Sequence, residues 1–283
     1  MNVDEILRNN RRVYDAMADA GNPLCQPATE AELANPLATL DPCGWLGGSL
    51  QGSHVLCLAA GGGRQSSLYA AAGASVTVVD LSGAMLELDR KMATERGWKV
   101  RLFETSMENL QMLRNAEFDL VVQPVSTCYV PEIQPVFRQV ARVLRGRGLY
   151  ISQHKNPVSL QSDLEPQHDQ LYRLQHPYYR QTPLPAPQSM TPAGRRLRES
   201  GATEFLHRWE QIVGGMCRSG FVIEDLVEPV HADPQAVPGS FGHRAKYVAP
   251  YLRIKARRVE GSGDLAAAPC ADSSGSRLWL PEN

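Results

Sequence analysis

The feature that most constrains the fold of this chain is a regular alternation of short apolar runs with helical patterns between residues 53 and 152. Apolar runs at 54–59, 76–79, 100–103, 118–122 and 148–152 enclose helical patterns at 64–72, 82–96 and 131–144. Buried parallel strands are continuous apolar runs, and strands that alternate with helices are typical of a sheet with helices on both faces. The sequence therefore predicts an α/β fold with a mostly parallel sheet.

The rest of the chain predicts additions to this sheet. Residues 1–52 combine an amphipathic helix at 2–20, which begins with the capping box of Asn2 and Glu5, with a Pro- and Gly-rich connection that has room for a short helix at 28–35. A proline-rich insertion at 153–203 interrupts the pattern, and we expect it to cover one end of the sheet. A helix at 204–219, a strand at 221–227 and an extended run at 246–257 follow, before a flexible tail at 259–283. We therefore expect a main domain at 53–258 with an N-terminal lid.

Composition excludes several classes of protein. Lys and Arg number 29 against 30 Asp and Glu, and this balance argues against a dedicated nucleic-acid binder. The basic cluster of the late strands is interpreted as a solvated face; it comprises Arg244, Lys246, Lys255, Arg257 and Arg258. No apolar run approaches the roughly 20 residues of a membrane span, and the acidic N-terminus lacks the pattern of a signal peptide. Six dispersed cysteines indicate reduced thiols, so a cytoplasmic location is predicted, and the His and Cys spacing predicts no metal site.

The strongest local signal is the loop Ala59-Ala60-Gly61-Gly62-Gly63, which follows the first strand and precedes a helix. Glycine lets a ligand approach the backbone N–H groups at the start of a helix. Asp80 ends the next strand, 19 residues after Gly61, which is where nucleoside-binding sheets hold a ribose hydroxyl. Capping of the following helix is the alternative role for Asp80. The dinucleotide fingerprint lacks its third glycine at Ser66, so a nicotinamide-dependent oxidoreductase is an open but weaker alternative.

Several motifs in order carry a family resemblance. The stretch Val55-Leu-Cys-Leu-Ala-Ala-Gly-Gly-Gly-Arg64 resembles the first motif of class I S-adenosylmethionine-dependent methyltransferases. Residues 103–110, 118–124 and 140–151 are similar to the later motifs and the fifth strand of that family. The resemblance implies a Rossmann-like, seven-stranded sheet whose last strand is antiparallel. It also implies S-adenosylmethionine as cofactor, S-adenosylhomocysteine as product, and a binding site formed by Ala59, Ala60, Gly61, Gly63, Arg64, Asp80, Leu81, Met85, Ser106, Met107 and Gln123.

This chain departs from the family pattern at three positions. Cys57 stands where the family usually has an acid, Ala59 where it usually has glycine, and Ser106 where it usually has Asp. The missing acid commonly helps to place the amino group of the cofactor, so another group or water must serve here. A hydroxyl at 106 can still bond the adenine amino group, less strongly than a carboxylate. A protein that binds S-adenosylmethionine or S-adenosylhomocysteine without catalysis is therefore a second alternative.

Methyl transfer from a sulfonium needs positioning of the acceptor and exclusion of water more than it needs a particular catalytic residue. A general base can assist when the acceptor is an alcohol, phenol or amine. The candidates are Tyr129 and His154, which follow the fourth and fifth strands, and Tyr14 on the N-terminal helix. His154 as an exposed loop residue and Tyr14 as a core aromatic are the competing interpretations. Because the insertion and the N-terminal segment can enclose a ligand, the sequence predicts methyl transfer to a small-molecule acceptor, with no nucleic-acid or membrane partner.

Overall fold

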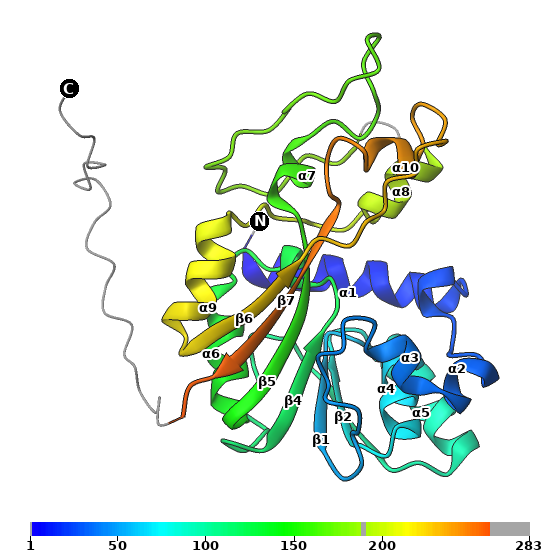
Figure 1. Ribbon diagram of the computed structural model, residues 1–283, viewed down its shortest axis with the longest axis vertical. Helices are drawn as coiled ribbons and strands as arrows, with labels where there is room; N and C mark the ends of the chain where they lie inside the picture. Colours follow the sequence, from blue (N-terminus) through cyan, green and yellow to red (C-terminus); the bar gives the residue numbers. More distant parts are fainter. Residues whose placement is uncertain (1, 188–190, 261–283) are drawn as a thin grey trace, which may run out of the picture.

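A single sheet of seven strands organises the residues described by the computed structural model, 2–187 and 191–260 (Figure 1). The strand order is β3-β2-β1-β4-β5-β7-β6. The strands are β1 (His54–Leu58), β2 (Ser75–Asp80), β3 (Val100–Glu104), β4 (Phe118–Gln123), β5 (Leu144–Lys155), β6 (Phe221–Val227) and β7 (Tyr251–Arg258). β1 to β5 are parallel, and β7 is antiparallel to both β5 and β6. The predicted α/β fold with an antiparallel last strand is confirmed.

Helices cover both faces of the sheet (Figure 1). One face carries α2 (Glu30–Ala34), α3 (Pro36–Leu40), α4 (Arg64–Ala71) and α5 (Gly83–Arg96); the other carries α6 (Gln134–Val143), the π-helical η3 (Glu210–Gly214) and α9 (Gly215–Arg218). Alternate residues of β1 therefore enter two different cores. Val55 and Cys57 share a buried cluster with Tyr69 of α4, whereas Leu56 and Leu58 share the other with Phe137 of α6. Burial on both sides is the physical reason why β1 has a continuous apolar sequence.

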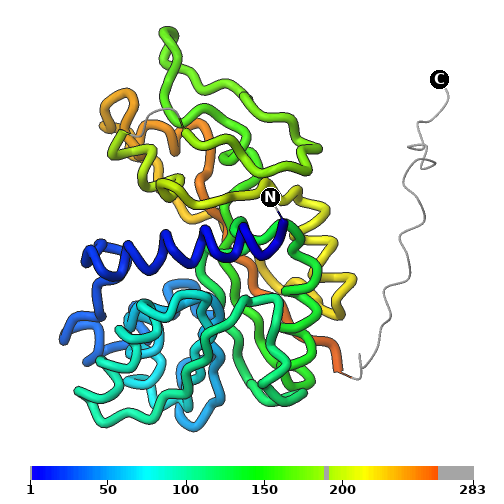
Figure 2. Tube along the Cα trace, turned by 180° about the vertical axis from the view of Figure 1, so that it is seen from behind, coloured from blue at the N-terminus to red at the C-terminus, as the bar shows by residue number. Residues whose placement is uncertain are grey.

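Above the carboxyl ends of the parallel strands, α1 (Val3–Asp19) lies between the sheet and the segments that complete the molecule (Figures 1 and 2). Its capping box is formed as predicted: the Glu5 N–H donates to Asn2 Oδ1 and the Asn2 N–H donates to Glu5 Oε2, both at 2.9 Å. The upper segments carry α7 (Pro157–Gln161), α8 (Pro192–Leu197) and α10 (Phe241–Arg244), and two short 3-10 turns occur at Pro23–Cys25 and Thr127–Tyr129.

The predicted helix at 204–219 is wrong over its first five residues, 204–208. Helical structure begins only at Trp209, because the preceding backbone bonds to other segments. The Phe205 N–H donates to the Cys128 carbonyl, and the Glu204 carbonyl accepts from the Leu184 N–H, each at 2.7 Å. The backbone of residues 204 and 205 is thereby engaged with the fourth-strand loop and the insertion instead of with a helix of its own.

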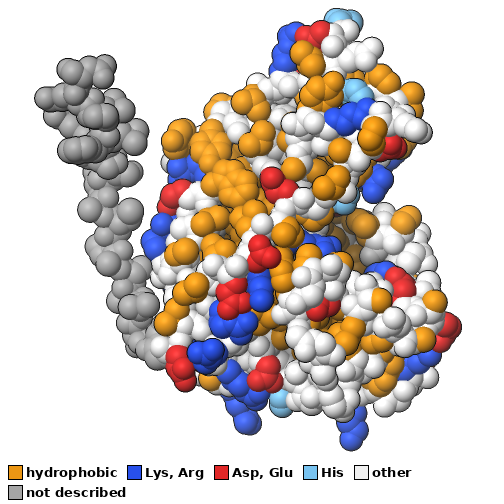
Figure 3. Space-filling model, in the orientation of Figure 1, with side chains coloured by type: hydrophobic (Ala, Val, Ile, Leu, Met, Phe, Trp, Pro, Cys, Tyr) orange, Lys and Arg blue, Asp and Glu red, His pale blue; other side chains and the backbone are white. Residues whose placement is uncertain are grey.

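The basic cluster is a solvated face only in part. Arg244 is buried: its guanidinium donates to the Asp163 carbonyl at 2.8 Å and to the Ser159 carbonyl at 2.8 Å, and so ties α10 to the insertion. Lys255 and Arg257 are more exposed, and both pair with Glu224 of the neighbouring β6. On the face shown in Figure 3, acidic and basic side chains lie interspersed.

The predicted tail lies, from residue 261 onward, outside the described residues. In the part of the chain that is described, no helix has both the length and the apolarity that crossing a bilayer requires.

Candidate active site

A cavity of about 890 Å³ lies at the carboxyl ends of β1, β2 and β4, where open α/β sheets bind their ligands. The glycine loop and Asp80 form its floor, and α1 crosses it through Leu7, Asn10, Tyr14 and Met17. The opposite wall is formed by residues 195, 196 and 198–200 with His231, Phe241 and Tyr251. Of the residues that the sequence predicts for cofactor binding, most line this cavity: Ala59, Ala60, Gly61, Arg64, Asp80, Leu81, Met85, Ser106 and Met107.

The glycine loop leaves no room for side chains beside Asp80. A Cβ on Gly61 would lie 2.8 Å from the Cβ of Met85 and 3.0 Å from Oδ2 of Asp80. Gly62 and Gly63 have φ angles of +111° and +82°, which L side chains rarely adopt. Ala59 has φ +49°, so the position where the family usually has glycine is left-handed here as well. The loop thus presents bare backbone to the cavity, as the predicted approach of a ligand requires.

Asp80 ends β2 with its carboxylate inside the cavity. Oδ2 accepts from the Gly61 N–H at 2.8 Å, and Oδ1 accepts from the Ser82 N–H at 2.9 Å. Burial raises the pKa of this carboxyl, and the backbone donors at Ser82 and Gly61 oppose that shift. Asp80 therefore does hold the start of α5, as the alternative role proposes, and the same carboxylate also faces the cavity. A carboxylate that lines a nucleoside-sized cavity beside bare backbone fits a ribose.

A second buried acid, which sequence reasoning missed, supports the glycine loop from behind. Asp89 on α5 is fully buried; its Oδ2 accepts from the Gly62 N–H at 3.0 Å, and its Oδ1 accepts from the Ser66 hydroxyl. Burial raises the pKa of Asp89 to about 7, although the donors at Ser66 and Gly62 lower it. The sequence did contain a signal, because Asp89 occurs at helical spacing from the buried Met85, Leu86 and Ala93.

The predicted adenine wall has a serine in place of the usual Asp. The Ser106 hydroxyl lies 3.2 Å from Oε2 of Glu108, whose pKa is raised by burial. Ser106 lines the cavity together with Thr105 and Met107. A hydroxyl that is bonded to a neighbouring carboxylate is a stronger acceptor than an isolated one, so this pair can take the place of the missing acid.

Three predicted site residues lie outside the cavity lining. Gly63 caps α4, where its carbonyl accepts from Ser67. The Gln123 amide donates to Ser126 Oγ at 2.9 Å and accepts from the Tyr150 hydroxyl. His154 is buried, with Nδ1 2.8 Å from Thr127 Oγ1 and Nε2 2.9 Å from Ser152 Oγ. Burial lowers the pKa of His154 to about 3, so this imidazole is a core group that faces away from the site and not an exposed loop residue.

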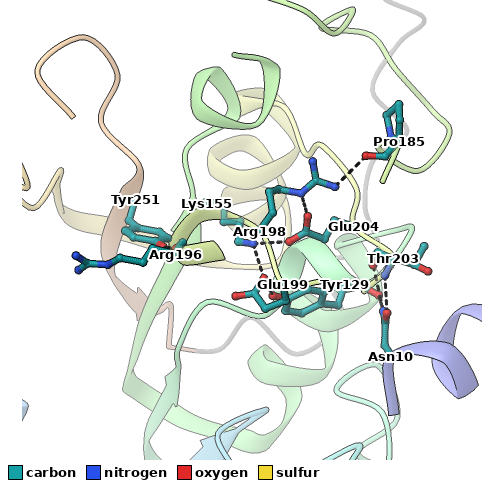
Figure 4. Close-up of polar contacts among 10 residues, drawn as sticks. All are labelled: Asn10, Tyr129, Lys155, Pro185, Arg196, Arg198, Glu199, Thr203, Glu204 and Tyr251. Atoms are coloured by element: carbon teal, nitrogen blue, oxygen red, sulfur yellow. Dashed lines mark hydrogen bonds and ion pairs between the residues drawn. The ribbon is translucent and has the colours of Figure 1, made fainter. Parts of the chain in front are cut away.

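The helix α1 is fixed over the cavity at two points along its length. Oδ1 of Asp15 accepts from the Ser82 hydroxyl at 2.5 Å, which joins α1 to the start of α5. Near the middle of the helix Asn10 is buried, and its amide donates to the carbonyls of Tyr129 and Thr203, both at 3.1 Å. Oδ1 of Asn10 accepts from the Thr203 N–H at 2.7 Å (Figure 4). Both polar atoms of the Asn10 side chain are therefore used to hold the lid, against Thr203 of the insertion and against the turn that contains Tyr129.

Two of the three predicted catalytic candidates meet inside the cavity. The rings of Tyr14 and Tyr129 pack edge to face with centroids 5.5 Å apart. The Tyr129 hydroxyl donates to Oε2 of Glu199, which also accepts from Lys155 Nζ at 2.7 Å (Figure 4). Burial raises the pKa of Tyr129 well above its ordinary value, and the Glu199 charge adds to this effect. Although burial opposes it, Lys155 lowers the pKa of Glu199.

Behind these residues lies a quartet of alternating charges on Lys155, Glu199, Glu204 and Arg198. Lys155 also pairs with Glu204, and Glu204 pairs with Arg198. The sequence did not indicate this quartet, because its members come from β5, from the proline-rich insertion and from the segment that follows it, and no periodicity relates them. Only Glu199 and Arg198 of the four line the cavity.

Cys57 is fully buried in the core beside α4, and burial raises the pKa of its thiol well above the ordinary value. Within 2–187 and 191–260, no three His, Cys, Asp or Glu side chains are grouped so that they could hold a metal ion.

An α/β sheet with a bare glycine loop and a carboxylate at the next strand end defines a nucleoside-binding enzyme. Residues 56–152 match the family model described as a methyltransferase domain. The uncharacterized methyltransferase YbaJ of Bacillus subtilis (strain 168) is 30% identical over 239 residues, which cover 80% of this chain and 91% of that protein. The ubiquinone biosynthesis O-methyltransferase of Bordetella avium (strain 197N) is 34% identical over 116 residues, 40% of this chain and 48% of that protein, so the match spans less than half of it.

Solved structures agree in fold. The S-adenosylmethionine dependent methyltransferase from Mesorhizobium loti has a TM-score of 0.58 at 22% identity, over 81% of this chain and 98% of that chain. Geranyl diphosphate C-methyltransferase from Streptomyces coelicolor A3(2), solved with Mg²⁺, geranyl diphosphate and S-adenosyl-L-homocysteine, has a TM-score of 0.59 at 15% identity, over 90% of this chain and 98% of that chain.

The chain belongs to the class I S-adenosylmethionine-dependent methyltransferase superfamily. It is a methyltransferase, and its cofactor is S-adenosylmethionine, as the sequence motifs predicted. The nicotinamide-dependent alternative is thereby disfavoured.

Proposed function

We propose that this methyltransferase acts on a small molecule that is held in the cavity beside the cofactor. Enclosure carries the proposal: α1 crosses the cavity, and residues 195, 196 and 198–200 with Phe241 and Tyr251 form its opposite wall. A volume of about 890 Å³ lies in the range of small-molecule sites, whereas a macromolecular acceptor needs an open groove. The name of the Bordetella avium relative refers to ubiquinone biosynthesis and that of the Streptomyces coelicolor neighbour to geranyl diphosphate, which supports a small acceptor.

In this proposal Asp80 holds the ribose, and Leu81, Met85, Ser106 and Met107 surround the adenine. Ala59, Ala60, Gly61 and Arg64 bound the amino-acid end, while Gly63 and Gln123 support the site from outside the lining. When bound, S-adenosylmethionine would supply a methyl group that its positively charged sulfur already activates. The chain itself has to orient the acceptor and exclude water, and α1 does the latter by covering the cavity.

We also propose that the Glu199 carboxylate receives the proton that an oxygen or nitrogen acceptor loses, while the Tyr129 hydroxyl, which donates to Oε2, holds that carboxylate in place. Lys155 and Tyr129 both bond Oε2 of Glu199, so Oε1 is free of these two partners. A carboxylate that is held in one orientation and lines the cavity can accept a hydrogen bond from an acceptor O–H or N–H. Glu199→Gln should then lower kcat and leave the Kd for S-adenosylhomocysteine unchanged. An unchanged kcat would exclude this role.

Residues 53–258 are proposed as the methyltransferase domain, with 1–52 as its lid and 153–203 as an insertion over the site. A cytoplasmic location stays a prediction.

A thermal-shift titration and a turnover assay test the assignment. S-adenosylhomocysteine should raise the Tm and NADH should not, because only a ligand of the folded state stabilises it. Asp80→Ala should weaken S-adenosylhomocysteine binding, whereas Glu104→Ala, at the paired register position on β3, should not. Turnover is followed as S-adenosylhomocysteine released with a panel of small phenols, carboxylic acids and amines. Methylation of protein or nucleic acid without turnover of any small molecule would contradict the small-acceptor proposal.

A further inference from the structure

Some of the charged side chains that line the cavity form ion pairs, and others do not. Arg64 pairs with Glu32, Arg198 with Glu204, and Glu199 with Lys155. Asp80 is bonded to backbone N–H groups at the cofactor end. Among the described residues, Arg195 and Arg196 have no acidic side chain within ion-pair distance, and both line the cavity. The end of the cavity opposite the glycine loop therefore carries two positive charges that no acidic side chain within residues 2–187 and 191–260 neutralises.

The second of these arginines is held in position from two sides. The guanidinium carbon of Arg196 lies 4.1 Å from the centroid of the Phe241 ring, and the Arg196 carbonyl accepts from the Tyr251 hydroxyl at 2.6 Å. Figure 4 shows Arg196 beside Tyr251 and pointing away from the quartet of Lys155, Glu199, Glu204 and Arg198. A guanidinium that is stacked on an aromatic ring keeps its donors for a planar anion such as a carboxylate, or for a phosphate.

The neighbouring groups agree with a positive potential at this wall. His231 lines the cavity next to Phe241 and Tyr251. Burial lowers the pKa of His231, and the charges of Arg196 and Arg253 lower it further. Arg195 and Arg196 are exposed, so water screens part of their charge, but the sulfonium charge of the cofactor adds to the positive potential at this wall. An anionic group on the acceptor is therefore favoured here over a neutral or cationic one.

We propose that the acceptor is a small anion with an apolar body, whose carboxylate or phosphate group binds Arg195 and Arg196. This inference rests on the proposed function, since it concerns the acceptor that occupies the same cavity. Phe241 and Tyr251 contact the apolar body, and Glu199 lies in the same wall to meet its nucleophilic group. The arginines thus select the acceptor by charge and leave the cofactor residues at the other end of the cavity unaffected.

Calorimetric titration of the protein saturated with S-adenosylhomocysteine tests the proposal with matched probes. The pairs are 3-phenylpropionate against 3-phenylpropanamide and phenyl phosphate against phenol, so that carboxylate and phosphate are compared separately. We expect the anion of at least one pair to bind roughly tenfold more tightly than its neutral partner, as a charge-assisted hydrogen bond provides. The pair with the larger difference identifies the anion.

The double variant Arg195→Gln/Arg196→Gln should reduce that preference to about twofold, while the Kd for S-adenosylhomocysteine stays unchanged. Arg173→Gln is the matched control, because Arg173 is an exposed arginine of the same insertion that pairs with Asp169 and lies outside the lining. Equal binding of anion and neutral partner in both pairs would overturn the proposal. A fall in S-adenosylhomocysteine affinity would also overturn it, because the arginines would then hold the carboxylate of the cofactor.

Failure of the proposed function gives a different result. If the enzyme acts on a macromolecule, none of the four probes affects turnover, and the double variant changes methylation of that macromolecule. If only the present inference fails, small neutral acceptors are still methylated, and the double variant methylates them at the rate of the parent chain.

Discussion

Replacing Asp89 by Asn should remove a pH-dependent loss of stability that originates behind the glycine loop. Asp89 is fully buried on α5 and accepts from the Gly62 N–H at 3.0 Å and from the Ser66 hydroxyl. Burial raises its pKa to about 7. Asn keeps an oxygen for the Gly62 N–H and carries no charge, so Asp89→Asn resembles the protonated form of the native side chain at every pH.

The magnitude follows from linkage. A carboxyl group whose pKa is higher in the folded chain binds more protons when it is folded, so its stabilising contribution is present at low pH and is lost as the pH rises. The loss begins near the ordinary value of about 4 and is complete above the folded value of about 7. About three units correspond to at most about 4 kcal/mol, with a slope of about 1.4 kcal/mol per pH unit between pH 5 and 7.

Urea unfolding at pH 5, 6, 7 and 8 measures this slope. The free energy of unfolding of Asp89→Asn, minus that of the parent chain, should rise steadily from pH 5 to 7 and then level off. Glu87→Gln is the control, because Glu87 is an exposed carboxylate on the same helix, and its difference from the parent should stay constant over this range. A constant difference for Asp89→Asn would refute the argument from burial.

Three further substitutions test the loop and the core. Gly61→Ala places a Cβ 2.8 Å from the Cβ of Met85, so the loop must shift. Calorimetry should show S-adenosylhomocysteine binding at least tenfold more weakly, and urea unfolding should show a loss of about 1–3 kcal/mol in the free energy of unfolding. Ala59→Gly relieves a left-handed φ of +49°, worth roughly 1–2 kcal/mol, and adds chain entropy that costs roughly 0.5–1 kcal/mol. The free energy of unfolding should therefore rise by at most about 1.5 kcal/mol, and a clear fall would contradict the strain. Burial lowers the pKa of His207 to about 4, so the neutral imidazole stabilises the fold above about pH 6.5, and this stabilisation is lost as the pH falls to 4. His207→Gln should therefore reduce the acid-induced loss of unfolding free energy by up to about 3 kcal/mol, measured by urea unfolding across this pH range. An unchanged pH profile would exclude this role of His207.

The sheet could be predicted from the sequence because its central strands β1, β2 and β4 are buried on both faces, which makes each of them a nearly continuous apolar run. The predicted helix at 204–219 failed for the opposite reason. Ile212 and Met216 are buried at helical spacing as expected, but Phe205 is buried in another environment, and its N–H bonds to Cys128. An apolar residue at helical spacing does not reveal which neighbour buries it. For Phe205 the neighbours are distant in the sequence, and they hold its backbone outside the helix.

The candidate site could be predicted where strand order alone determines position. The carboxyl ends of β1, β2 and β4 bring Gly61, Asp80 and Tyr129 to one cavity. The prediction that His154 lies in the site was wrong by a single position, because successive residues of a strand point to opposite faces of the sheet. Ser152 and His154 share the core face and bond each other, whereas Gln153 lines the cavity. The sequence shows where β5 lies, but it does not show which residues of β5 point to the core and which point to the cavity, since both faces of this strand are buried.

The missing acid of the first motif has a structural counterpart that the sequence pattern alone could not assign. Cys57 is buried close enough to Asp89 that the charge of Asp89 adds to burial in raising the pKa of the thiol. An acid at 57 would place a second carboxylate next to Asp89 in the same low-dielectric core, where two like charges cannot both ionise without a large cost. The thiol at 57 and the acid at 89 are therefore mutually consistent. Asp89 bonds the Gly62 backbone and does not line the cavity, so it shapes the loop and leaves contact with the amino group of the cofactor to the residues of the lining.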